Sequence, residues 1–467
     1  MGCSICPGDQ KFQNVVLLSI SFMLVFTAFQ TLINIEQTVL TSVQIHDATF
    51  TGNAYISSAI VYFFFSLCNW LAPPVVSLLG PKWTMVVGSV IYSVFIATFL
   101  WPNTTLLYTM SAVLGFGAAI LWTAQGCYLT LSSSPETMSR NSGVFWAILQ
   151  SSMFFGNSFV YWQFYGSKEI STEMRQIVFS VLTVISVIGI CCFVFLRAVS
   201  PFRQEGDPDS DLNLRVIRDS PVDSMTKSFR LFFTNKKMLL LSVTFFYTGI
   251  ELSFYSGVYS TAVGNTSTLV EAKRLVGLIG ILVGAGEILG GASFGILATR
   301  TVKFGRDPVV LLGFVSHIVA FYLIFINLPN ESPLRPIEST AAASYLNPPW
   351  VGFLMLAAFL LGFGDSCFNT QLFSILGNLF PESSAPAFAL FKFTQSAAAA
   401  ASFFYSSKFT LMVQLSILVV FSILGTLSFF IVEWGEASRS HATFDAVISE
   451  DNDDNEQLLP EEGEEEE

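Results

Sequence analysis

The sequence predicts an all-α membrane protein of twelve transmembrane helices, arranged as two pseudo-symmetric six-helix halves. Hydrophobic residues make up 52% of its 467 residues and charged residues only 12%, about half the charge of a soluble domain. Apolar runs of about 20 residues, the length that crosses a bilayer, recur along the chain. Short motifs of the first half return in the second half in the same order. Such internal repeats are typical of transporters that build a central site.

The duplication is visible in four pairs of segments. The four segments of the first half recur in the same order in the second half. Within each pair, small residues and polar residues fall at matching places. The pairs are Thr27–Gln30 with Thr248–Glu251, Gly80–Gly88 with Gly305–Gly313, Gln125–Tyr128 with Asp365–Phe368, and Phe145–Ser151 with Leu390–Ser396.

The expected spans divide the chain into two bundles, 13–196 and 238–433. A polar stretch at 197–237 separates them and reads as a cytosolic linker. The short N-terminus 1–12 is expected in the cytosol, and the acidic tail 434–467 as a disordered cytosolic segment. The twelve helices are expected near 13–40, 52–79, 83–101, 106–131, 142–165, 177–196, 238–262, 274–299, 308–328, 350–380, 386–406 and 409–433.

The placement of basic residues predicts that both termini face the cytosol. With the N-terminus inside, fifteen of the 22 Lys and Arg residues fall in inner segments and six in outer segments. Three glycosylation sequons, at Asn103, Asn265 and Asn330, all fall in loops that this topology places outside. Their shared side supports the same orientation and makes them candidates for N-glycosylation.

Polar residues inside the apolar spans mark the candidate site. In the first span, Gln30 and Asn34 belong to a stripe with helical spacing, which faces a bundle or a wet cavity because lipid cannot satisfy it. The second half places acids where the first has amides. A charge at the bilayer centre costs at least about 2.5–3.5 kcal/mol, so these residues need partners or water. The candidates for substrate or proton contact are Gln30, Asn34, Gln125, Gln150, Glu251, Glu287, Asp365, Lys392 and Gln395.

Structural roles stand beside these functional ones. Asp365 and Lys392 can form a bridge that locks two helices, and Lys392 can extend to the cytosolic surface. The glutamines can serve helix–helix hydrogen bonding as well as ligand contact. The functional role is favoured for Glu251 and Asp365, and the two roles are even for Glu287 and Lys392.

The sequence predicts no enzyme, cofactor, metal or nucleic-acid site. Its three histidines, His46, His317 and His441, are scattered, and its seven cysteines have no zinc-site spacing. The glycine-rich stretches lie at membrane depth without a preceding strand, so they are not nucleotide loops. The expected partners are the lipid bilayer, an unknown small solute and an unidentified membrane protein.

Gly305 and Arg306 in the loop after the eighth span, with Gly80 and Lys82 after the second, resemble the loop motif of the major facilitator superfamily. The first copy has Pro81 in place of the usual arginine. More specifically, the segments 26–30, 121–126, 140–146 and 364–371 resemble the Unc-93 family, over about residues 11–435.

This resemblance implies a twelve-helix facilitator fold with alternating access at its midplane. It also implies two candidate functions. One is a secondary transporter of a small solute, with proton coupling as a further expectation. The alternative is a trafficking chaperone or ion-channel regulatory subunit that transports nothing.

The two ends of the chain carry targeting signals. Asp454, Leu458 and Leu459 resemble an acidic dileucine signal that a sorting adaptor reads, which predicts an endosomal or lysosomal membrane rather than the plasma membrane. Cys3 and Cys6 are candidates for acylation beside the membrane.

Overall fold

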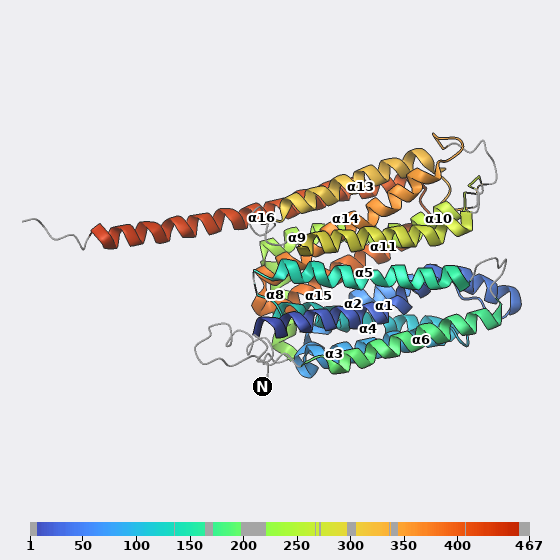
Figure 1. Ribbon diagram of the computed structural model, residues 1–467, viewed down its shortest axis with the longest axis horizontal. Helices are drawn as coiled ribbons and strands as arrows, with labels where there is room; N and C mark the ends of the chain where they lie inside the picture. Colours follow the sequence, from blue (N-terminus) through green and yellow to red (C-terminus); the bar gives the residue numbers. More distant parts are fainter. Residues whose placement is uncertain are drawn as a thin grey trace, which may run out of the picture.

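A computed structural model shows a bundle of long helices that run roughly parallel to one axis (Figure 1). It describes residues 7–134, 136–163, 171–197, 221–266, 268–269, 272–296, 305–335, 337, 344–406 and 408–456. Two halves lie side by side, with α1 to α6 in the lower part of the view and α9, α11, α13, α14 and α16 in the upper part, while α15 lies below α5 beside α2.

The first half contains α1 (Pro7–His46), α2 (Ala54–Cys68), α3 (Ala72–Thr98), α4 (Thr104–Leu131), α5 (Met138–Gln163) and α6 (Thr172–Phe195). Three of these helices begin at a side-chain cap. Asn53, Asn103 and Ser171 each accept a backbone hydrogen bond from the first turn that follows, which satisfies an N–H group the helix itself cannot pair.

The second half begins with α9 (Lys236–Ser253), whose last turn passes into a π-helical turn η1 (Phe254–Val258) and then α10 (Tyr259–Gly264). Together these three form one continuous span. The remaining helices are α11 (Ala272–Ile296), α13 (Asp307–Asn327), α14 (Val351–Leu379), α15 (Ser384–Ser406) and α16 (Leu411–Glu456), with a short 3₁₀ turn η2 (Pro381–Ser383) before α15.

Nine helical stretches in the described part of the chain are long and apolar enough to cross a membrane. Helices stand at all twelve expected places, but α2, α5 and α15 fall outside that criterion of length and composition. The last two are more polar for a structural reason. α5 carries Gln150 and Asn157 and α15 carries Lys392 and Gln395, all directed into the protein rather than into lipid.

Two glycines mark the same place in each half. Gly80 has φ 74° and Gly305 has φ 85°, a left-handed conformation that favours glycine. Gly80 produces a kink inside α3, so that the part before it completes the second span and the part after it forms the third. Gly305 stands just before α13. The duplicated loop motif therefore has a glycine with positive φ at the same place in both halves.

The segments outside the bundle differ from expectation in two ways. The linker, expected to be a loop, contains an amphipathic helix, α8 (Pro221–Thr234), which packs against α3 and α15. The tail was expected to be unstructured after Glu433, whereas α16 runs on as helix to Glu456 and out of the bundle (Figure 1). A helix already nucleated in a span extends at little cost, and Ala and Glu in the extension are good helix formers.

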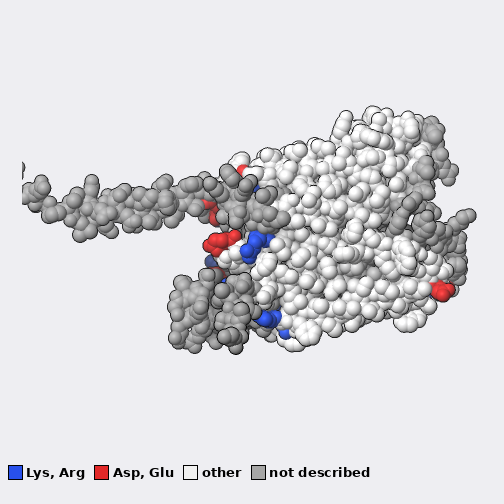
Figure 2. Space-filling view, in the orientation of Figure 1, with Lys and Arg blue, Asp and Glu red and all other residues white. Residues whose placement is uncertain are grey.

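The surface of the bundle has the polarity of a membrane protein. Its long flanks show almost no charge among the described residues, while the visible Lys and Arg side chains gather at one end (Figure 2). We call this end, where α1 begins and α16 leaves the bundle, the linker end. Exposed tryptophans ring both ends, with Trp83 and Trp434 at the linker end and Trp101, Trp162 and Trp350 at the other. Such belts are typical of the membrane–water interface.

The two halves are packed tightly together at the linker end. A Cβ atom added to Gly126 of α4 would meet the Phe388 ring of α15 at 2.2 Å. One added to Gly377 of α14 would meet the Met138 side chain of α5 at 2.4 Å. At both contacts the halves fit together without space for one further methyl group, so they are closely packed at the linker end.

Candidate functional site

A cavity lies between the two halves, with walls from α1 to α5 on one side and α9, η1, α14 and α15 on the other. Its volume is about 130 Å³, close to that of an engineered protein cavity that binds benzene. One wall carries both an acid, Asp365, and a base, Lys392. Other lining residues are aromatic or uncharged polar: Phe26, Phe29, Gln30, Asn34, Tyr62, Tyr92, Trp122, Trp146, Gln150, Tyr255, Asn369 and Gln395.

Three acids of the second half meet behind this wall, and we call Glu251, Glu287 and Asp365 the carboxyl cluster. Asp365 lies close enough to both glutamates to interact with them electrostatically. Neither oxygen of Glu251 accepts a hydrogen bond from another described group. Carboxylates only accept hydrogen bonds, so contact between carboxyls in a buried site requires a proton on one of them.

A histidine extends the cluster away from the cavity. His317 of α13 places Nε2 3.5 Å from Oε1 of Glu251 and 3.1 Å from the carbonyl oxygen of Leu361. Its Nδ1 lies 2.5 Å from the hydroxyl oxygen of Tyr247. The neutral tautomer that satisfies both contacts carries hydrogen on Nε2, which donates to Leu361, while Nδ1 accepts from Tyr247. Gly364 makes room for the ring, since a Cβ there would lie 2.3 Å from it.

The base, Lys392, is held inside the protein. Its side chain is 4% exposed, and Nζ donates to Oε1 of Gln395 at 2.7 Å. Aromatic rings of Phe391 and Trp122 lie 4.4 and 4.5 Å from Nζ, where a π-face attracts a cation. Lys392 therefore does not extend to the surface, and it makes no ion pair with Asp365 within 4 Å.

The first half reaches this charged wall with two tryptophans. Trp146 of α5 donates its indole N–H to Oε2 of Glu287 at 2.5 Å. Trp122 of α4 offers its ring face to Lys392. One buried acid and the buried base of the second half thus each contact a tryptophan of the first half.

Amide pairs form the rest of the wall, and the duplication is visible in them. In the first half, Gln30 of α1 donates to Gln150 of α5 at 3.0 Å. In the second half, Gln395 of α15 donates to Thr248 of α9 at 3.1 Å. Both contacts join the first and fifth spans of their half, which is the relationship that the sequence repeats predict. Asn34 also donates to Asn157 of α5, at 3.1 Å.

Other predicted residues lie away from the cavity. Gln125 is buried in α4 and does not line the cavity. Neither its side-chain nitrogen nor its side-chain oxygen has a hydrogen-bond partner among the described residues. Asn103, Asn265 and Asn330 lie at the end opposite the linker end. Cys3, Cys6, Leu458 and Leu459 lie outside the described residues, as does the side chain of Asp454.

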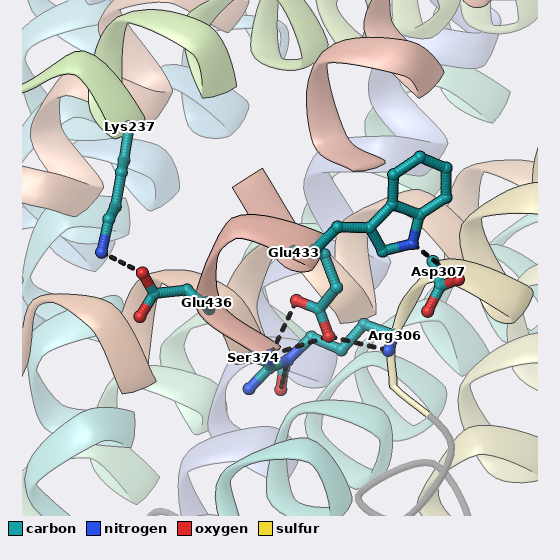
Figure 3. A network of polar contacts seen from close by, with 7 residues as sticks. Lys237, Arg306, Asp307, Ser374, Glu433 and Glu436 are labelled. Atoms are coloured by element: carbon teal, nitrogen blue, oxygen red, sulfur yellow. Dashed lines mark hydrogen bonds and ion pairs between the residues drawn. The ribbon is translucent and has the colours of Figure 1, made fainter. Parts of the chain in front are cut away.

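The two loop motifs lie at the linker end and differ in their contacts. Arg306 donates from Nη1 to Glu433 of α16 at 2.9 Å and from Nε to Ser374 of α14 at 3.1 Å (Figure 3). Beside it, Lys237 of α9 pairs with Glu436. In the first half, Lys82 instead lies over the neighbouring Trp83 ring at 5.2 Å. The second motif therefore ties three helices together through Arg306, whereas the described contact of Lys82 is local.

Sequence reasoning missed four residues of the site. His317 was considered only as a metal ligand, and Tyr247, Trp122 and Trp146 were not singled out for a role. A signal was available for each, because all four carry polar hydrogen-bonding atoms inside apolar spans, as the predicted amides do. Their contacts depend on which helices are neighbours in space, which the sequence alone does not give.

Comparison with known proteins agrees with this architecture. The family model "Ion channel regulatory protein UNC-93" matches residues 48–430. The UNC93-like protein MFSD11 of Xenopus laevis is 45% identical over 443 residues, which cover 93% of this chain and 98% of that protein.

Two solved transporters share the fold at low sequence identity. The proton:xylose symporter XylE superposes with a TM-score of 0.63 at 12% identity, over 90% of this chain and 94% of its own. The transporter FucP, in an outward conformation, gives 0.62 at 13% identity, over 90% and 99%. The protein is therefore an integral, multi-pass membrane protein with the major facilitator fold, and it belongs to the UNC-93 family.

Proposed function

We propose that this protein is a secondary transporter that moves a small solute by alternating access between its two halves. The observation that carries the proposal is the central cavity, where Asp365 and Lys392 share one wall. Burying both an acid and a base at membrane depth is costly, and a site that recognises a polar solute explains why both are retained. Tight closure at the linker end agrees with one state of an alternating cycle.

The carboxyl cluster is proposed to be the proton site of this transporter. Asp365 belongs both to the cavity wall and to the cluster, so it is placed to sense solute on one side and exchange a proton on the other. Glu251 and Glu287 would share that proton. The amides Gln30, Asn34, Gln150 and Gln395 would supply neutral hydrogen bonds to the solute.

The test starts by finding a solute. Purified protein is screened by thermal shift against metabolite pools at two pH values, because a ligand that binds the folded state raises its melting temperature. Uptake of the hit is then measured in proteoliposomes that contain a pH-sensitive dye. We expect Glu251→Gln with Asp365→Asn to abolish solute uptake and the accompanying proton movement.

The control is Glu331→Gln, which changes an exposed acid in a loop and should leave uptake at the wild-type rate. Uptake and proton movement that survive the double variant would refute the proposed role of the carboxyl cluster.

A second candidate function is regulation or escort of another membrane protein. The description of the matching family model, an ion channel regulatory protein, favours it. The buried acids would then hold the fold together or contact the partner within the bilayer. Co-purification of a stoichiometric membrane partner, together with no transport of any screened solute, would favour this function over transport.

The orientation proposed is with both termini in the cytosol. The gathering of Lys and Arg at the linker end supports it, because cytosolic segments are enriched in these residues. The linker and α8 would then lie in the cytosol, and the loops that contain the three sequons outside. The domain boundaries proposed are those predicted from the sequence, with α8 added within 197–237.

The location proposed is the endosomal or lysosomal membrane. Asp454, Leu458 and Leu459 would act as the signal read by a sorting adaptor. Leu458→Ala with Leu459→Ala should move the protein toward the cell surface, and an unchanged distribution in cells would remove the idea. Acylation is proposed at Cys3 or Cys6, and Cys3→Ser with Cys6→Ser should abolish labelling by an alkyne analogue of palmitate.

A further inference from the structure

We infer that Trp146 and Glu287 form a proton-controlled latch between the two halves. The inference rests on the proposed function, because it links the proposed proton site, the carboxyl cluster, to a residue of the opposite half. Trp146 donates its indole N–H to Oε2 of Glu287 at 2.5 Å. The two side chains are 5% and 0% exposed, so the contact is shielded from bulk water while the halves are joined.

The latch lies in an interface where glycine residues on either side of it allow two helices to pack closely. α5 and α11 lie side by side at the boundary between the halves (Figure 1). A Cβ on Gly291 would lie 2.7 Å from the backbone nitrogen of Ala147, and one on Gly284 would lie 3.0 Å from Met153. Glycine allows these helix backbones to approach closely. The Trp146–Glu287 hydrogen bond is therefore a specific polar contact between two helices, α5 and α11, whose backbones otherwise pack closely through glycine.

The chemistry of the pair makes the contact depend on a proton. An indole N–H only donates, and a hydrogen bond to an ionised carboxylate is roughly twice as strong as one to a neutral acceptor. The ionised form of Glu287 thus favours the joined halves. If α5 moves away while Glu287 is ionised, a charge is left buried without its donor, so proton uptake by Glu287 is the cheaper route to separation.

The groups around Glu287 can supply or accept that proton. Asp365 of α14 and Glu251 of α9 both lie close enough to interact electrostatically with Glu287. Tyr255 of η1 and Cys367 of α14 also lie close enough to interact electrostatically with Glu287. None of these four neighbours is a cation, so ionised Glu287 depends on the Trp146 N–H for direct stabilisation.

The latch is tested by a distance measurement that needs no solute. Spin labels are placed at Glu136→Cys and Glu382→Cys, two exposed positions at the linker end in opposite halves, in full-length protein whose native cysteines are replaced by alanine. Pulsed electron paramagnetic resonance in lipid nanodiscs then gives the populations of near and far states at pH 8 and pH 5. The wild type should be mainly in the near state at pH 8 and gain the far state at pH 5.

Trp146→Phe keeps the ring and removes the N–H. It should raise the ratio of far to near states at pH 8 by about tenfold, in line with loss of a hydrogen bond to a charged group, and weaken the pH dependence. Glu287→Gln cannot ionise and should make the ratio independent of pH. The matched control is Trp162→Phe, an exposed tryptophan near the end of the same helix, which should behave as the wild type.

The outcomes separate the latch from transport. A wild type without pH dependence, or Trp146→Phe with the wild-type ratio at both pH values, would overturn the latch. A pH-dependent distance that Trp146→Phe abolishes, in a protein that moves no solute in proteoliposomes, would keep the latch and refute the transporter. Monodisperse elution and a cooperative thermal melt of each variant confirm that it is folded.

Discussion

Arg306 binds Glu433 through both its side chain and its own backbone. Nη1 lies 2.9 Å from Oε2 of Glu433, and the backbone N–H donates to Oε1 at the same distance (Figure 3). Because φ at Gly305 is positive, the chain turns sharply just before Arg306 and brings both donors to one carboxylate. The loop motif of the second half is thus fixed to the last helix of the bundle.

Removal of the Arg306 side chain should destabilise the second half. Glu433 is 8% exposed and would keep only its backbone donor, so we expect Arg306→Ala to lower stability by about 1–3 kcal/mol. The value is below that for a fully buried pair because Arg306 itself is 21% exposed.

The melting temperature of the purified protein measures this loss of stability. The control is Arg335→Ala, whose partner Glu331 and own side chain are 47% and 69% exposed, and which should change stability by less than about 1 kcal/mol. Equal effects of the two variants would contradict the prediction.

Closure at the linker end should depend on Gly126. A methyl group there would lie 2.2 Å from the Phe388 ring, which is fully buried. Gly126→Ala should therefore favour separation of α4 from α15, at a cost to the closed state of about 1–3 kcal/mol. The measurement is the rate at which a thiol reagent labels a cysteine placed at Ser384, a buried position at the start of α15.

That labelling rate should rise in Gly126→Ala and fall back when Phe388→Ala is added. Gly277→Ala on α11 is the control, because a Cβ there meets nothing within 4 Å. If Gly126→Ala leaves the rate unchanged, the two halves do not separate at this contact.

The general plan of the fold was predictable because it depends on properties of short stretches of sequence. Span length, hydropathy and the repeated segments predict helices at the places where they occur. The repeats also align Gly80 with Gly305, and the structure gives both residues a positive φ. The extent of α16 was not predictable in this way, because composition indicates that a segment lacks a core but not that a preceding helix continues through it.

The site was predicted in part, for a physical reason. Polar groups inside apolar spans are costly, so the sequence identifies Glu251, Glu287 and Asp365 without information on their neighbours. To predict which of these side chains contact one another, one must also know which helices are neighbours in space. Asp365 therefore meets the two glutamates rather than forming the bridge with Lys392 that was considered, and Trp146 reaches Glu287 from the other half. Gln125 shares the sequence pattern of the other glutamines but not their place in the cavity.

Gln125 should be replaceable at no cost to stability. Its amide is fully buried and neither polar atom has a partner among the described residues, so Gln125→Leu removes an unsatisfied group. We expect stability to rise by about 1 kcal/mol. Gln150→Leu is the comparison, because it breaks the 3.0 Å bond from Gln30 and should lower stability by a similar amount. Thermal melts of both variants measure the difference. A loss in Gln125→Leu as large as that in Gln150→Leu would show that Gln125 has a partner in the working protein.

Glycosylation should separate Asn103 from the other two sequons. Asn103 is exposed at the start of α4, where its side chain accepts one backbone hydrogen bond and its Nδ2 is free to carry a glycan. In contrast, Nδ2 of Asn265 donates to the carbonyl oxygen of Ser332, and the sequon residues Thr266 and Ser332 are fully buried.

We therefore expect protein from animal cells to lose its glycosidase-sensitive mass in Asn103→Gln and to keep it in Asn265→Gln and Asn330→Gln. Electrophoretic mobility before and after glycosidase treatment measures this. The same experiment tests the orientation, because a glycan on Asn103 places the end opposite the linker end outside the cytosol. A wild-type protein without any glycan, or one whose glycan survives Asn103→Gln, would contradict the assignment to Asn103.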